Sequence, residues 1–116
     1  MHLERVRVET LDGIIERYGM PDLVKIDVEG FEADVVAGLS EPVPAVSMEF
    51  HAEYLDGARA CVAHLDRIGD YRYQLSFGES MELAFPEWVR AEELRERLAQ
   101  LPAMAWGDAY ARLDQG

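Results

Sequence analysis

Segments with the periodicity of strands and segments with the periodicity of helices alternate along this chain, and this order constrains its fold more than any other feature. Residues 5–9 and 71–77 alternate apolar and polar side chains, which is the pattern of a half-buried strand. Residues 23–28 form a compact run rich in β-branched side chains, and residues 45–50 follow a breaker that contains two prolines. All four segments are predicted strands.

Apolar residues at helical spacing predict a helix after each of the first three strands. Thr10 and Asp56 are the expected N-terminal caps of the first and third helices, because their side-chain oxygens can accept orphan backbone N–H groups. Beyond residue 77 the chain predicts a turn at 78–80, a short strand at 81–85 and a last strand at 109–113. The predicted helices are residues 10–18, 30–39, 56–68 and 94–101.

This order predicts an α/β fold with a mostly parallel sheet, because strands joined by helices are connected through right-handed crossovers. Ligands of such sheets bind at the carboxyl ends of the strands. Asp27 and Glu29 follow one predicted strand, and Glu49 and His51 follow another, so we expect all four at the functional edge. Lys25 lies on the same side of its strand as Asp27, because side chains alternate along a strand.

Two interpretations of these residues follow from the pattern alone. If the two strands are neighbours, three carboxylates and an imidazole converge, and proteins keep such clusters for a metal, a proton transfer or hydroxyl binding. Alternatively, they are separate solvated side chains and helix caps, with Glu29 beside a helix N-terminus and His51 in a hydrogen-bonding role. Lys25 is either a partner of these acids or a lysine whose stem covers apolar surface.

Composition narrows the class of protein. The 116 residues fit one domain, and 49% of them are hydrophobic, enough for a buried core. A net charge of -12 argues against binding to nucleic acid or an anionic membrane. The single cysteine, Cys61, excludes a disulfide framework and lies on an apolar helical stripe, which predicts a core residue. Without a membrane-length apolar run or a signal segment, the expectation is a soluble cytoplasmic protein.

Several motifs together resemble one enzyme family. The string TLD at residues 10–12 is followed at residues 21–32 by PDLVKIDVEGFE. Later segments are SMEFH at residues 47–51, GES at 78–80 and GDAYAR at 107–112. This series closely resembles the FkbM family of methyltransferases. The resemblance implies a Rossmann-like class I fold that uses S-adenosylmethionine and methylates hydroxyl oxygens of small molecules, including polyketides and sugars.

The cofactor motif expected of such a fold is missing. A nucleotide-type cofactor on a parallel sheet needs a glycine-rich first strand-to-helix turn, yet the nine glycines are scattered singly. In family terms, residues 1–116 resemble strands four to seven, the C-terminal, acceptor-side portion of the catalytic domain. By this resemblance, we expect residues 1–116 to lack the N-terminal strands that bind the cofactor. We therefore expect a partial enzyme, inactive alone; the alternative is a non-catalytic binding or interaction module derived from a methyltransferase.

The missing strands leave a strand edge to be explained. The strand at residues 23–28 would normally pair with the missing first strand, and an open edge in mid-sheet invites association. We expect a homodimer, a partner chain or a local rearrangement to cover this edge.

The resemblance also gives the candidate residues roles. His51 is the expected base, Glu49 orients it or binds the acceptor, and Asp27 contacts the acceptor or a metal. Glu29 and Lys25 are expected to help bind the acceptor. A divalent metal is possible chemistry for these acids, but no metal-binding motif supports one.

Overall fold

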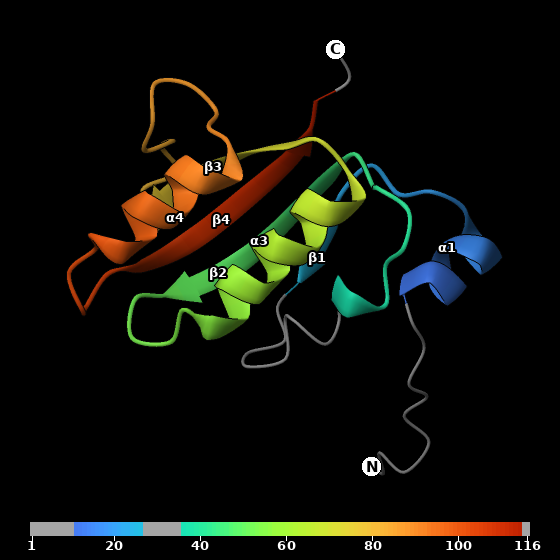
Figure 1. Cartoon of the computed structure of the whole chain (residues 1–116), viewed down its shortest axis with the longest axis horizontal. Coiled ribbons are helices and arrows are strands. Elements are labelled where there is room, and N and C mark those ends of the chain that lie inside the picture. Colours follow the sequence, from blue (N-terminus) through green and yellow to red (C-terminus); the bar gives the residue numbers. More distant parts are fainter. Residues whose placement is uncertain (1–10, 27–35, 115–116) are drawn as a thin grey trace, which may run out of the picture.

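A computed structural model describes residues 11–26 and 36–114, and every structural statement below concerns these residues. They form three helices and four strands in one α/β arrangement (Figure 1). None of these helices is long and apolar enough to cross a lipid bilayer. In chain order the elements are α1 (Leu11–Tyr18), β1 (Val24–Ile26), β2 (Ala45–His51), α3 (Asp56–Ile68), β3 (Tyr71–Phe77), α4 (Ala91–Ala99) and β4 (Trp106–Leu113).

Some predicted segments lie outside the described residues. These are the strand at 5–9, the cap Thr10 and most of the helix at 30–39, of which Val36 and Ala37 are described and helical. Within the described ranges, the helices at 11–18, 56–68 and 91–99 and the strands at 45–51 and 71–77 agree closely with the predictions. Asp56 is the first residue of α3 rather than its cap, because Leu55 precedes the helix and no side chain caps it.

The sheet is mixed and mostly antiparallel, so the prediction of a mostly parallel sheet is wrong for the described strands. The strand order is β1-β2-β4-β3. β1 and β2 are parallel, whereas β4 lies between β2 and β3 and runs antiparallel to both. The strands β1, β2 and β3 therefore point the same way, as the crossovers required, and only β4 is reversed.

An extra crossing of the sheet explains why β4 is reversed. After β3 the chain runs back along that strand, where Val89 forms an antiparallel bridge with Tyr73. Helix α4 then returns to the carboxyl end of β3, and Gly107 pairs with Phe77 there. Each pass changes the chain's direction, so β4 must run back toward the start of β3. The predicted strand at 81–85 is not formed, and this segment is part of the returning loop.

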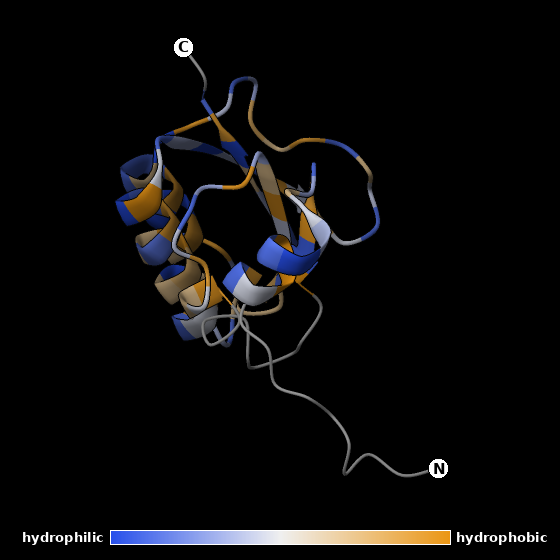
Figure 2. Cartoon of the chain, turned by 90° about the vertical axis from the view of Figure 1, so that its right-hand side faces the viewer, coloured by the Kyte–Doolittle hydropathy of each residue, from blue (hydrophilic) through white to orange (hydrophobic). Residues whose placement is uncertain are grey.

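The two faces of the sheet differ in character. On β2, Val46, Met48 and Phe50 are buried toward the helices, whereas Ser47, Glu49 and His51 alternate with them on the other face. Figure 2 shows α3 and α4 together on one side of the sheet. The alternation means that one face holds the core and the other presents polar side chains, which include both predicted site residues of β2.

Asp12 attaches α1 to residues 38–40, at the end of the second predicted helix. Its backbone N–H donates to the Gly38 carbonyl at 3.0 Å, and its carboxylate accepts the Ser40 N–H at 2.8 Å. The hydrogen bonds from Ser40 hold the pKa of Asp12 below its ordinary value of 3.8. A carboxyl group with a lowered folded-state pKa stabilises the fold above its unfolded-state pKa.

We therefore expect the stabilisation from Asp12 to be complete at neutral pH. It should be lost as the pH falls below 3.8 and through the lower folded-state pKa. Asp12→Asn removes the charge and keeps an oxygen acceptor. The test is urea unfolding between about pH 2.5 and pH 7, a range that spans the titration of carboxyl groups. The variant should be less stable than the parent at neutral pH, and the two free energies of unfolding should converge in acid. Parallel stability curves would contradict this assignment.

Candidate functional site

The carboxyl ends of β1, β2 and β3 lie at one edge of the sheet, together with the beginning of β4 (Figure 1). At this edge His51 ends β2 and is directly opposite Trp106, the first residue of β4. Phe77 ends β3 beside Gly107. The topology therefore brings β2, β3 and β4 together where ligands of α/β sheets bind.

Glu49 and His51 form a hydrogen-bonded pair at this edge. They lie two residues apart on the polar face of β2, with 3.0 Å between Glu49 Oε1 and His51 Nε2. The carboxylate can only accept, so in the neutral imidazole Nε2 carries the hydrogen and Nδ1 keeps a lone pair. Their side chains are 43% and 40% exposed, so both remain accessible to a ligand. The predicted proximity of Glu49 and His51 is confirmed.

β4 adds two residues to the edge that the sequence prediction missed. Trp106 stacks on His51 with ring centroids 6.4 Å apart and an interplanar angle of 20°. Asp108 pairs in register with Glu49 on one side and with Ser76 on the other. The predicted strand began at Ala109, three residues late. Alternation of Trp106 and Asp108 with small residues was the signal that could have extended it.

Beneath these residues the polar face continues as a hydrogen-bonded row. Ser76 is buried, and its hydroxyl lies 3.1 Å from that of Tyr110. Lys25 is exposed on β1 and pairs in register with Ser47, two residues before Glu49. Lys25 is therefore on the same face of the sheet as the Glu49–His51 pair, but farther from the edge.

The remaining predicted site residues, Asp27 and Glu29, lie outside the described residues. Their convergence with the pair on β2 therefore stays a prediction. Among residues 11–26 and 36–114, no group of three or more histidine, cysteine, aspartate or glutamate side chains is arranged to hold a metal ion.

Two further side chains that can carry chemistry, Cys61 and His64, have structural positions. Cys61 is fully buried in the core, as predicted. The imidazole of His64 lies 2.6 Å from the Leu39 carbonyl, at the boundary between α3 and the preceding segment. Both are therefore explained by packing and hydrogen bonding on the helix-covered side of the fold.

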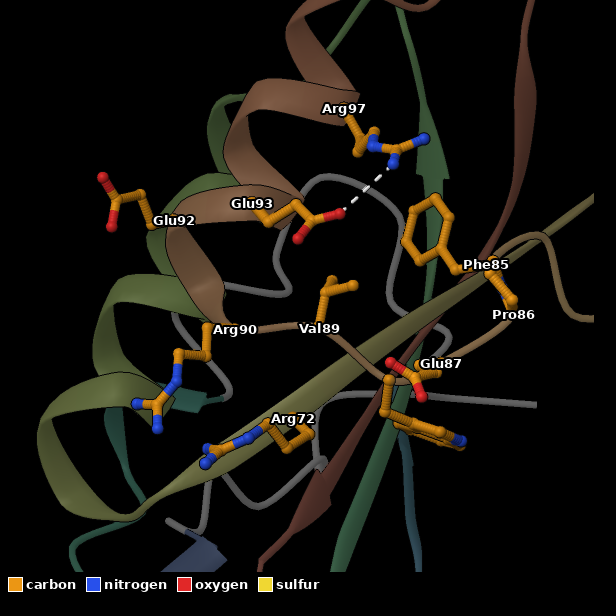
Figure 3. Close-up of a pocket in the computed structure, with 10 residues that line it drawn as sticks. Arg72, Phe85, Pro86, Glu87, Val89, Arg90, Glu92, Glu93 and Arg97 are labelled. Atoms are coloured by element: carbon orange, nitrogen blue, oxygen red, sulfur yellow. Dashed lines mark hydrogen bonds and ion pairs between the residues drawn. The ribbon is translucent and has the colours of Figure 1, made fainter.

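A depression of about 500 Å³ lies around Arg72, near the first residue of β3 and thus at the opposite end of that strand from the site (Figure 3). Two of its three arginines have intramolecular partners: Arg72 pairs with Asp114 at 3.2 Å, and Arg97 with Glu93 at 3.2 Å. Because three glutamates line the depression together with its three arginines, it offers no unbalanced charge to a ligand.

The described residues do not form a cradle for a nucleotide-type cofactor. Such a cradle needs glycine where a strand leads into a helix, so that the backbone can approach the ligand. The connection from β2 to α3 at residues 52–55 has no glycine, and the connection from β3 to α4 has one, Gly78. A Cβ at Gly78 would lie 3.8 Å from the Trp106 ring, so that side chain already occupies the adjacent space.

Comparison with known proteins gives one match. The family model described as "Methyltransferase FkbM domain" matches residues 2–90, well over half of the chain. The matched region includes β1, β2, α3 and β3, and ends at the residue before α4. No curated protein and no solved structure matches the chain.

Proposed function

Because the chain belongs to the FkbM methyltransferase domain family, we propose that it supplies the acceptor side of an O-methylation of a small-molecule hydroxyl group. Family membership implies use of S-adenosylmethionine. The observation that carries the proposal is the Glu49–His51 pair, which is exposed at the carboxyl end of β2. A hydroxyl is a poor nucleophile near neutral pH, so an adjacent base is the group that this reaction needs from the protein.

We propose a role for each side chain of this pair and for its neighbour on β4. Glu49 accepts a hydrogen bond from His51 Nε2–H, which orients the ring and leaves Nδ1 to take the proton of the acceptor hydroxyl. The carboxylate then lies beside the imidazolium and stabilises its positive charge. Asp108, in register with Glu49, is a second acceptor for substrate hydroxyl groups.

Three further side chains have proposed roles in acceptor binding. Asp27 follows the last residue of β1 in the chain and is proposed to contact the acceptor. Glu29 and Lys25 are proposed to bind other polar groups of the acceptor, and the position of Lys25 on the polar face of the sheet supports its role.

We propose that the cofactor side comes from a second copy or a partner chain that covers the edge at residues 23–28. Among the described strands, β1 pairs with β2 alone. Beside it, Met20 and Leu23 are 48% and 54% exposed. Exposed apolar side chains beside the end of a sheet favour the addition of a segment from another chain.

Calorimetric titration with S-adenosylmethionine, together with the mass of the chain in solution, tests this proposal. We expect micromolar binding only from a species heavier than the 13.1 kDa monomer. A folded monomer that binds equally well would show that the assembly is unnecessary. A folded chain that neither assembles nor binds the cofactor would favour a non-catalytic interaction module derived from a methyltransferase.

A further inference from the structure

The hydrogen bond from His51 to Glu49 does not by itself fix the orientation of the imidazole. It joins Nε2 of His51 to Oε1 of Glu49 at 3.0 Å, and the ring can still turn about this line. Both side chains are partly exposed, and exposed acid–base pairs are held weakly, because water competes for each partner and side-chain rotation opposes the contact. A second contact is therefore needed to keep the ring in one plane.

Trp106 makes that second contact. It lies directly opposite His51 on the neighbouring strand β4, with ring centroids 6.4 Å apart and planes that differ by 20°. Offset stacking at this separation is attractive between aromatic rings. Turning the imidazole about its hydrogen bond to Glu49 would tilt it out of the stack, so the indole opposes the one rotation that the hydrogen bond permits.

The segments around Trp106 hold the indole in turn. The Gly78 N–H donates to the Trp106 carbonyl at 2.8 Å, and a Cβ at Gly78 would lie 3.8 Å from Cζ2 of the indole. The Ala52 N–H donates to the Ala105 carbonyl at 2.9 Å, which joins the residue after His51 to the residue before Trp106. The indole is therefore bordered by His51 of β2 and by the backbone that follows β3.

The plane of the imidazole decides whether His51 can act as a base. Nδ1 has to come within about 2.6–3.2 Å of the hydroxyl oxygen of the acceptor, along the direction of its lone pair. An error of about 1 Å in the position of a catalytic group can lower the rate by about 100-fold. A ring that turns freely would meet this requirement for only part of the time.

We infer that Trp106 is a positioning residue for His51. Its indole holds the plane of the imidazole, while Glu49 holds Nε2, and the two contacts together direct Nδ1 toward one place. This inference deepens the proposed function, on which it rests, by adding a residue that acts through the base. Its effect is on the rate of methyl transfer, and it requires no contact between Trp106 and the acceptor.

Relaxation of the His51 ring carbons, measured by NMR on the whole chain without cofactor, tests the inference directly. Trp106→Leu keeps an apolar side chain and removes the aromatic face. We expect the order parameter of the imidazole to fall from about 0.8 to below about 0.6. Trp106→Phe keeps a planar face and should retain the higher value. Trp106 is 40% exposed at the first residue of β4, so both variants should fold, which the amide spectrum checks.

Trp88→Leu is the matched control, because Trp88 is the other tryptophan of the chain. Its ring stacks on the guanidinium of Arg112, with Cζ 4.3 Å from the ring centroid, near the opposite end of β4. Removing this ring should leave the order parameter of His51 unchanged.

Turnover of the assembled, cofactor-binding enzyme gives the second readout. Trp106→Leu should lower kcat by about 10-fold or more and change the KM for the acceptor by less than about 2-fold, because alignment is lost and binding is kept. Trp106→Phe should restore most of kcat, and Trp88→Leu should keep the parent value.

Four results would overturn the inference. They are an unchanged order parameter in Trp106→Leu, an equal change in Trp88→Leu, an unchanged kcat in Trp106→Leu, and a failure of Trp106→Phe to restore kcat. A higher KM with an unchanged kcat would assign Trp106 to binding of the acceptor instead. The proposed function fails separately if His51→Ala leaves kcat unchanged while Trp106→Leu still releases the ring.

Discussion

Gly107→Ala is expected to destabilise the fold by about 3 kcal/mol or more, or to prevent folding. A Cβ at this position would lie 1.9 Å from the Ser76 carbonyl oxygen and 2.9 Å from the Phe77 Cα. Both obstacles are backbone atoms of β3, so no side-chain rotation relieves the overlap. β3 and β4 would have to separate at the edge that carries the site. Urea unfolding gives the free energy, and an NMR amide spectrum shows whether the fold is kept.

Ala109→Gly is the matched control, because it changes the same strand two residues further on and on the same face. It removes a methyl group and adds backbone freedom, so a cost of about 1 kcal/mol is expected. If both variants lost similarly small amounts of stability, close approach of the two strands would not explain the glycine.

The second large effect is expected at the proposed base. His51→Ala should lower kcat of the assembled, cofactor-binding enzyme by about 100-fold or more, since general bases contribute 10²- to 10⁴-fold. Glu49→Gln should cause a smaller loss, because the amide still holds the ring by a hydrogen bond but no longer stabilises the imidazolium. Steady-state release of the demethylated cofactor measures both effects.

His64→Ala provides the control for a general effect of removing histidine. That imidazole is hydrogen-bonded to the Leu39 carbonyl on the helix-covered side of the sheet. Its loss should reduce stability and leave kcat unchanged at temperatures where the variant is folded. Turnover unchanged in the His51 variant, or reduced equally in both variants, would remove His51 from the mechanism.

Local patterns predicted the elements whose environment is uniform along their length. β3 alternates strictly because one of its faces packs on the helices, and α3 carries a continuous apolar stripe that includes Cys61 and Leu65. The periodicity of the sequence is enough to predict helices and strands of this kind. The direction of β4 was not predicted in this way, because it depends on how many times the chain runs along the sheet after β3. No local pattern encodes that number.

The site was predicted in part for the same reason. Glu49 and His51 share a face by strand alternation alone, so their pairing followed from one segment. Trp106 and Asp108 reach the site through pairing of β2 with β4, which lie more than 50 residues apart. Gly107 interrupted the apparent strand between them, although the structure shows that a glycine is required there for close approach.

The insertion of β4 between β2 and β3 also sets an order of events during synthesis. β2 and β3 have no hydrogen bonds with each other, and each pairs instead with β4. Until residues 106–113 have left the ribosome, the facing edges of these two strands stay unpaired. Pairing over such separations is slow and exposes strand edges to aggregation. A nascent chain stalled before residue 106 should therefore depend on chaperones, even though most of its core residues have already been made.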